Sequence, residues 1–245
     1  MTARMDAMTD TELREQLRGA CRELSRRSLT FGTSGNISVR RDERCFFVSP
    51  TGMAYDALES DDIPLVDDGG CWFGRRRPSS EWRFHRDIYR ARGEVAAIVH
   101  THSLKATSLA CTGRGIPAFH YMVAIAGGAD IRCAPYCTFG TQELSDAAVV
   151  ALAGRKACLL ANHGVITVGA DLPAALALAG EVENLAAQYC TALSIGDVQI
   201  LDDIEMCRVA ERFRSYGKQQ GADSGLVQSG ANFPSATVEE IDRGD

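Results

Sequence analysis

The sequence predicts a single α/β domain, and three observations support this fold class. The 245 residues include 45% hydrophobic and 24% charged residues, which is enough to bury a sizeable core. Segments with helical periodicity alternate with short apolar runs that end at turn residues. No repeat or linker interrupts the chain before about residue 217. We therefore expect one domain over 1–217, followed by a polar, Gly- and Ser-rich tail over 218–245 that is mobile.

Helices and strands can be placed from periodicity and end signals. The first helix begins at a capping box formed by Thr9 and Glu12, because a Thr and a Glu three residues apart satisfy each other's backbone N–H groups. Helices are expected at 10–28, from caps at Ser79 and Ser80 to about 92, after His102, from 138–141 to Gly154, at 172–193 and at 204–216. Strands are expected at 37–40, 45–49, 63–66, 71–74, 95–99, 157–161 and 165–168. The turn 67–70, Asp-Asp-Gly-Gly, predicts a hairpin between the third and fourth strands.

Composition excludes several classes of function. The net charge of −6 and the pI of about 5.4 give no sign of a nucleic-acid or acidic-lipid partner. The first ten residues contain no apolar run, so no signal peptide is expected, and no later run is long enough to cross a bilayer. The nine cysteines are scattered without a CxxC pair. We expect free thiols and a cytoplasmic protein.

Two of the five histidines form a His-x-His pair at the end of an expected strand. Side chains alternate along a strand, so His100 and His102 project from the same face. His163 follows another expected strand in a Gly-containing turn, and Glu81 offers a carboxylate. Together these four side chains could bind zinc. The pair alone is more typical of ordinary exposed or hydrogen-bonded histidines than of metal ligands, and for His85 the structural interpretation is favoured.

Small polar residues and glycines cluster at three turns that could bind a phosphate group through backbone N–H groups, hydroxyls or an amide. The residues concerned are Thr33, Asn36, Thr51, Gly52, Ser79 and Ser80. Each cluster on its own is more typical of a turn or a helix cap than of a phosphate site. A Walker A motif and a GxGxxG motif are both absent, which disfavours a nucleotide ligand.

Six motifs in this order resemble the class II aldolase/adducin family, most of all its members that act on L-fuculose 1-phosphate. The resemblance covers about residues 10–217 and is far more specific than any single motif. The motifs are Gly32-Thr33-Ser34-Gly35-Asn36-Ile37-Ser38-Val39-Arg40, Ser49-Pro50-Thr51-Gly52, Pro78-Ser79-Ser80-Glu81-Trp82-Arg83-Phe84-His85, Val99-His100-Thr101-His102, Ala134-Pro135-Tyr136-Cys137-Thr138-Phe139-Gly140-Thr141 and Asn162-His163-Gly164. The resemblance implies a central, largely antiparallel β-sheet flanked by helices on both faces, with 1–217 as the catalytic domain.

The resemblance also implies roles for individual residues. His100, His102 and His163 match three zinc ligands, and Glu81 matches a carboxylate that binds the resting zinc and then acts as acid and base. A phosphate cradle is implied at Asn36, Thr51, Gly52, Ser79 and Ser80. Further substrate contacts are implied for Thr33, Phe139 and Tyr216, and a catalytic role in a neighbouring subunit's site for Tyr121. Cys137 departs from the alanine that many family members carry.

The implied activity is reversible cleavage of a ketose 1-phosphate into dihydroxyacetone phosphate and a small aldehyde, with one Zn²⁺ per chain in a homotetramer. L-fuculose 1-phosphate and 5-deoxy- or 5-methylthio-ribulose 1-phosphate are the expected substrates. The alternatives within the family are a phosphopentulose 4-epimerase, a sugar-acid-phosphate decarboxylase and a methylthioribulose-phosphate dehydratase. A non-enzymatic adducin-like scaffold would be expected to lack the metal histidines, which this chain keeps.

Overall fold

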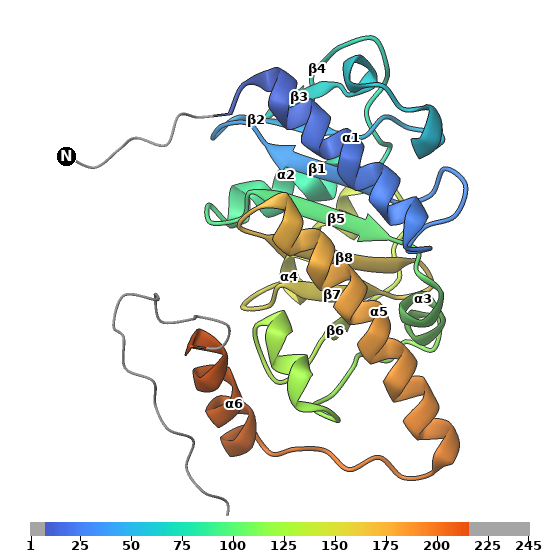
Figure 1. Ribbon diagram of the computed structural model, residues 1–245, viewed down its shortest axis with the longest axis vertical. Helices are drawn as coiled ribbons and strands as arrows, with labels where there is room; N and C mark the ends of the chain where they lie inside the picture. The colour runs from blue at the N-terminus through green and yellow to red at the C-terminus, as the bar shows by residue number, and fades with distance from the viewer. Residues whose placement is uncertain (1–7, 216–245) are drawn as a thin grey trace, which may run out of the picture. The chain divides into compact units, whose positions relative to one another are not determined.

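An eight-stranded sheet lies at the centre of the computed structural model, which describes residues 8–215 (Figure 1). Its strand order is β4-β3-β2-β1-β5-β8-β7-β6. Neighbouring strands are antiparallel except β6 and β7, which run parallel. The strands are β1 (Asn36–Arg40), β2 (Cys45–Val48), β3 (Leu65–Asp67), β4 (Trp72–Phe73), β5 (Ala97–Thr101), β6 (Arg132–Ala134), β7 (Ala157–Leu160) and β8 (Gly164–Gly169). The predicted α/β class with a largely antiparallel sheet is confirmed.

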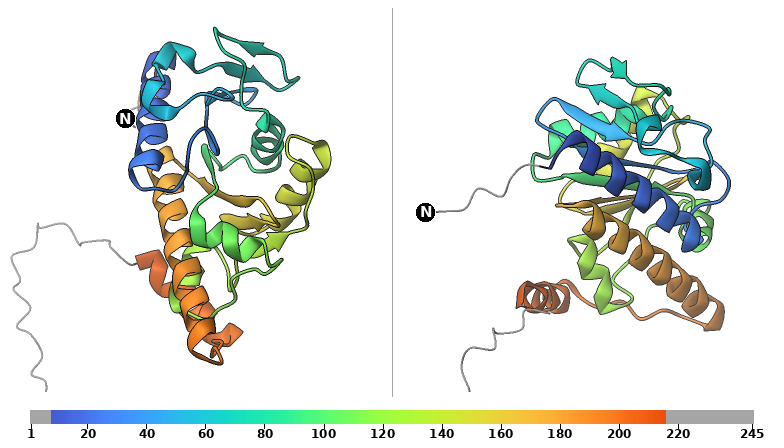
Figure 2. Two further views of the ribbon diagram at one scale, coloured as in Figure 1. Left: turned by 90° about the vertical axis from the view of Figure 1, so that its right-hand side faces the viewer. Right: turned by 45° about the horizontal axis from the view of Figure 1, so that its top comes forward.

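Helices cover both faces of this sheet. One face packs against α1 and α5 and the other against α2 and α4, as the left view of Figure 2 shows. The helices are α1 (Asp10–Arg26), α2 (Trp82–Ala91), α3 (Leu104–Ala110), α4 (Gln142–Ala151), α5 (Leu172–Ile195) and α6 (Asp203–Ser215), with short 3₁₀ turns η1 (Tyr55–Ala57), η2 (Ser60–Asp62) and η3 (Tyr121–Ala126). Within residues 8–215, no helix combines the length and apolar character needed to cross a membrane.

Alternation along β1 directs polar side chains toward the face that α2 covers. Ile37 and Val39 are buried in the core beneath α1 and α5. Asn36 and Ser38 therefore project to the opposite face, because successive strand residues alternate. Asn36 is the cross-strand partner of His100 on β5, so both residues lie on the α2 side of the sheet.

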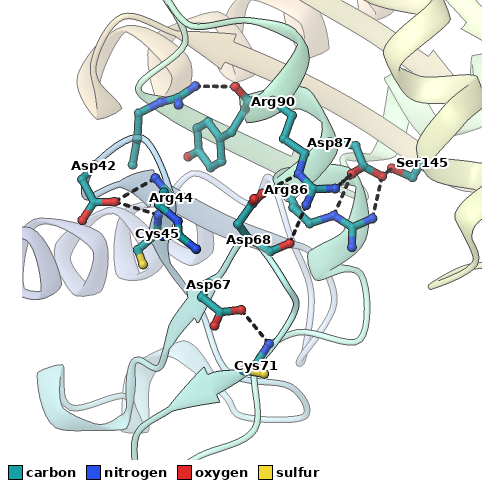
Figure 3. Close-up of polar contacts among 12 residues, drawn as sticks. Asp42, Arg44, Cys45, Asp67, Asp68, Cys71, Arg86, Asp87, Arg90 and Ser145 are labelled. Carbon is teal, nitrogen blue, oxygen red and sulfur yellow. Dashed lines mark hydrogen bonds and ion pairs between the residues drawn. The ribbon is translucent and has the colours of Figure 1, made fainter.

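Polar contacts on the outer side of α2 fix this helix between the β3–β4 hairpin and α4 (Figure 3). Arg90 donates to Asp68 in the hairpin turn. Asp87 pairs with Arg86 at 2.7 Å and accepts a hydrogen bond from Ser145 of α4, also at 2.7 Å. These contacts set the rotation of α2, so that its inner side, with His85 fully buried, faces the sheet.

Several local predictions are confirmed, and others need correction. The Thr9–Glu12 capping box is present. β5 begins at Ala97 instead of residue 95 and includes His100. Ser79 and Ser80 are not the helix cap, because the N-cap of α2 is Glu81. β6 was not predicted, since three residues without alternation give no periodic signal. The expected tail, 218–245, lies outside the described residues.

Candidate active site

Three histidines converge where β5 ends and β7 turns into β8. His100 is in β5, His102 follows that strand directly, and His163 lies in the turn between β7 and β8. One ring nitrogen of each lies within 4.8 Å of the others, and the Nε2 atoms of His100 and His102 are 3.0 Å apart. The expected convergence of separate strand ends is therefore present.

The β7–β8 turn brings these rings together through two special backbone positions. Asn162 adopts a left-handed conformation with φ of 54°, which Asn tolerates better than most residues. At Gly164, a Cβ atom would lie 2.4 Å from the carbonyl oxygen of Thr101 and 2.9 Å from Cδ2 of His102. Only glycine allows β8 to pass this close to the histidines.

The ring nitrogens are prepared to bind a cation. Nδ1 of His100 lies 3.0 Å from the carbonyl oxygen of Val165, so Nδ1–H donates there and Nε2 keeps its lone pair. Burial lowers the pKa of His102 to about 3 and that of His163 to about 4, with the neighbouring His100 adding to both effects. Both side chains are therefore neutral near pH 7.

Glu81 completes the cluster from the N-cap position of α2. Its Oε2 lies 3.3 Å from Nε2 of His100, and its Oε1 lies 3.2 Å from Nε2 of His163. Burial raises the pKa of this carboxyl, but the His100 and His163 rings and the amide of Asn36 outweigh that effect and hold the pKa at about 2. The carboxylate is therefore ionised at neutral pH.

The four side chains fit a divalent metal ion. Ligands placed about 2.1 Å from a tetrahedral zinc lie about 3.4 Å from one another, close to the distances of 3.0, 3.2 and 3.3 Å found here. Oε1 of Glu81 is buried and has no hydrogen-bond partner within residues 8–215. A cation would satisfy this oxygen, and three histidine nitrogens with a carboxylate form a common zinc donor set.

A pocket of about 280 Å³ opens beside the histidines and joins most of the predicted site residues. None of its lining residues in the described chain is Lys or Arg, so a bound phosphate would be held by hydroxyls and backbone N–H groups. The lining consists of Thr33, Ser34, Gly35, Pro50, Thr51, Gly52, Ser79, Ser80, Glu81, His102, Tyr136, Cys137, Phe139, Asn162 and His163.

Four predicted residues do not line this pocket. His100 in β5 is fully buried beside it. Asn36 lies behind Glu81, only 3% exposed, and its amide contacts Glu81 and His85 instead of the pocket. Tyr121 begins η3, is half exposed and lies outside the pocket lining of its own chain. Tyr216 lies outside the described residues.

Sequence reasoning gave no role to two features of this site. Tyr136 and Asn162 line the pocket although no function was predicted for either. His85, interpreted as structural, contacts Asn36 directly beneath Glu81. Its position four residues after Glu81 on α2 is the signal that could have revealed this relation, since such residues share a helix face.

The match to a family model identifies the chain's relatives. The model of the class II aldolase and adducin N-terminal domain matches residues 15–190. This chain belongs to that family. The resemblance found in the sequence motifs is confirmed, and the matched segment contains Glu81 and all three clustered histidines.

Individual relatives in this family are also similar over most of the chain. The 5-methylthioribulose-1-phosphate/5-deoxyribulose-1-phosphate aldolase of Rhodospirillum rubrum is 52% identical over 84% of this chain and 92% of its own length. The L-fuculose phosphate aldolase of Escherichia coli K12 is 44% identical over 86% of this chain and 98% of its own. A solved structure of an L-fuculose 1-phosphate aldolase, 39% identical, covers 85% of this chain and 99% of its own with a TM-score of 0.81.

Proposed function

We propose that this protein is a zinc-dependent aldolase that reversibly cleaves a ketose 1-phosphate into dihydroxyacetone phosphate and a small aldehyde. One observation carries the proposal. Neutral nitrogens of His102 and His163, the lone pair of His100 Nε2 and the Glu81 carboxylate meet beside a pocket lined by small hydroxyl and glycine residues. Membership of the class II aldolase family supports the same reaction type.

The aldehyde half of the substrate is inferred from the pocket wall and from the relatives. L-fuculose 1-phosphate, 5-deoxyribulose 1-phosphate and 5-methylthioribulose 1-phosphate all release a small aldehyde with an apolar end. Phe139 and Tyr136 line the pocket and are 65% and 62% exposed, so they offer apolar surface to such a group. A difference of one methylene in such a contact changes discrimination by only about 1–3 kcal/mol. Several small aldehydes should therefore be accepted.

Cleavage leaves negative charge on substrate oxygens, so the site needs groups that stabilise this charge and transfer a proton. A bound Zn²⁺, one per chain, would act as a Lewis acid that stabilises this charge. Cleavage also releases a proton from the hydroxyl that becomes the aldehyde carbonyl. Glu81 lies next to the histidines and is ionised, so it can take up a proton released in this way and deliver it to the carbon that loses the aldehyde. His100, His102 and His163 would hold the metal, and the carbonyl of Val165 orients His100.

The phosphate group serves to hold the substrate in a fixed position in the pocket. Thr33, Thr51, Gly52, Ser79 and Ser80 line one pocket with Glu81, which supports a phosphate cradle beside the reacting carbons. Each hydrogen bond to a charged phosphate contributes roughly 1.5–3 kcal/mol. This binding energy orients the reacting carbons, so an unphosphorylated substrate should react poorly.

A second subunit would complete the site. We infer a homotetramer in which Tyr121 acts on the departing aldehyde in a neighbouring subunit. The support is that Tyr121 is half exposed and outside the pocket of its own chain.

All nine cysteines are free thiols, which fits the expected reducing cytoplasm.

The test is a product assay with the zinc-loaded protein and the three ketose 1-phosphates named above. We expect dihydroxyacetone phosphate and the matching aldehyde in equal amounts, and much less product from the unphosphorylated ketoses. An epimer, a dehydrated product or CO₂ without dihydroxyacetone phosphate would assign the site to an alternative reaction and contradict the proposal. Equal activity on the unphosphorylated ketoses would contradict the assignment of the phosphate cradle.

A further inference from the structure

A row of buried polar groups extends from Glu81 into the core between β1 and α2. Nδ2 of Asn36 lies 2.9 Å from Oε2 of Glu81, and Oδ1 of Asn36 lies 2.6 Å from Nε2 of His85. Oγ of Ser38 lies 2.7 Å from Nδ1 of His85 and 2.8 Å from the hydroxyl oxygen of Tyr89. All five side chains are buried.

Two periodicities bring these groups into one row. Asn36 and Ser38 are two residues apart on β1 and therefore project from the same face of the strand. Glu81, His85 and Tyr89 are spaced by four residues and lie along one side of α2. The two sets alternate along the interface, because β1 and α2 contribute successive members of the row.

The ionised Glu81 carboxylate at one end of this row determines the direction of every hydrogen bond in it. An ionised carboxylate only accepts, so the amide of Asn36 presents its Nδ2 to Glu81 and its Oδ1 accepts from His85. Burial lowers the pKa of His85 to about 3, so the ring is neutral and carries its one proton on Nε2. Nδ1 then accepts from Ser38, and Ser38 accepts from Tyr89, whose pKa is raised by burial.

We propose that His85 is a positioning residue that fixes the amide of Asn36 and through it the carboxylate of Glu81. Without the His85 donor, the amide of Asn36 can rotate and present its oxygen to the carboxylate, which repels Glu81 from the histidines. The inference rests on the proposed role of Glu81 as metal ligand and acid. It predicts effects on zinc affinity and kcat, with little effect on KM, because the row does not reach the phosphate side of the pocket.

Two substitutions at His85 separate positioning from packing. Gln places its amide nitrogen near the position of Nε2 and can still donate to Asn36, whereas Asn reaches only the Nδ1 side. Both remove a ring that packs against Phe46 and Phe84, so both should lower stability. We expect His85→Gln to keep kcat within about threefold, and His85→Asn to lose roughly tenfold or more in kcat, with KM nearly unchanged.

Zinc affinity, measured by competition with a chromogenic chelator, should fall with kcat in His85→Asn and stay near the native value in His85→Gln. Equal zinc affinity and equal kcat per folded molecule in the two variants would overturn the positioning role and leave His85 as a packing residue. A native protein that binds no zinc would refute the proposed function itself, which keeps the two failures distinguishable.

The native protein offers a second measurement that needs no substitution. ¹⁵N NMR of histidine-labelled protein should show His85 as the neutral Nε2–H tautomer, with Nδ1 as a hydrogen-bond acceptor. This readout stands even if both variants fail to fold. A protonated Nδ1 on His85 would overturn the proposal, because Asn36 would then have to donate to His85 and present its oxygen to Glu81.

Discussion

Oε1 of Glu81 lies 3.2 Å from Nε2 of His163, yet the two atoms are not aligned as a hydrogen bond, and this oxygen has no hydrogen-bond partner within residues 8–215. A buried carboxylate oxygen without a partner is costly, since the lost solvation is not replaced. A cation held jointly by Glu81 and the histidines removes this cost. This unpartnered oxygen therefore supports the proposed metal site, in which the carboxylate would take part.

The first prediction concerns the metal. His163→Ala removes one of three nitrogen ligands and should lower the affinity for zinc strongly, since losing a ligand leaves an incomplete coordination shell. Metal analysis after dialysis should show about one zinc per native chain and a large loss in the variant. His120→Ala is the matched control, because His120 lies outside the cluster. Full zinc retention with normal activity in His163→Ala would contradict the assignment.

The second prediction concerns the β7–β8 turn. Gly164→Ala places a Cβ 2.4 Å from the carbonyl oxygen of Thr101 and against His102, so β8 must shift away from the histidines. We expect weaker zinc binding and a lower melting temperature. Gly93→Ala, where a Cβ meets no atom within 4 Å, is the control and should have little effect on either. The same zinc affinity in both variants would show that the turn does not position the cluster.

The third prediction concerns the subunit that supplies Tyr121. Tyr121→Phe and Glu81→Gln should each lower activity on their own. Mixing the two variants under conditions that exchange subunits should raise activity above the mean of the separate variants, because about a quarter of the sites would then pair a native Glu81 with a native Tyr121. Sizing experiments should show a tetramer. A fully active monomer, or no gain on mixing, would refute action across an interface.

The fourth prediction concerns pH. The folded pKa of His85 is lowered from 6.5 to about 3, so the unfolded chain binds a proton below pH 6.5 that the folded chain does not. This proton favours unfolding, and the free energy of unfolding contributed by His85 falls by about 1.4 kcal/mol per pH unit well below 6.5. Denaturant titrations between pH 7 and 4.5 should therefore show a shallower decline in His85→Gln than in the native protein.

The titratable groups near His85 also affect how the free energy of unfolding depends on pH. Glu81 has a lowered pKa of about 2, so its own contribution is lost only as the pH falls below about 4.5. Tyr89, whose pKa is raised by burial, keeps its proton throughout. Identical slopes for the native protein and His85→Gln would show that His85 is protonated in the folded state.

The sequence predicts most of the sheet because hairpin turns and apolar runs are local signals. Thr9 and Glu12 mark the first helix, and 67–70 mark the β3–β4 hairpin, without any information from distant residues. β6 escapes prediction because its three residues become a strand only by pairing with β7. Tertiary pairing, unlike a cap or a turn, leaves no pattern within three residues.

The histidine cluster was predictable only in part, because only the His-x-His spacing is a local signal. The His-x-His spacing places His100 and His102 on one face, but the approach of His163 depends on the order of β5, β8 and β7 in the sheet. Asn36 was assigned to the phosphate cradle from resemblance, whereas its buried amide is committed to Glu81 and His85. Only the packing of α2 against β1 reveals that pairing.

The central claim is that Glu81 exchanges a proton with the carbon next to the substrate carbonyl, and one measurement tests it without knowledge of the aldehyde. Zinc-loaded protein is incubated with dihydroxyacetone phosphate alone in D₂O, and the hydroxymethyl hydrogens are followed by NMR. We predict exchange of one of the two hydrogens in the native protein, and a rate lower by roughly 10²-fold or more in folded, zinc-loaded Glu81→Gln. The absence of exchange in the native protein, or equal exchange in Glu81→Gln, would contradict the account.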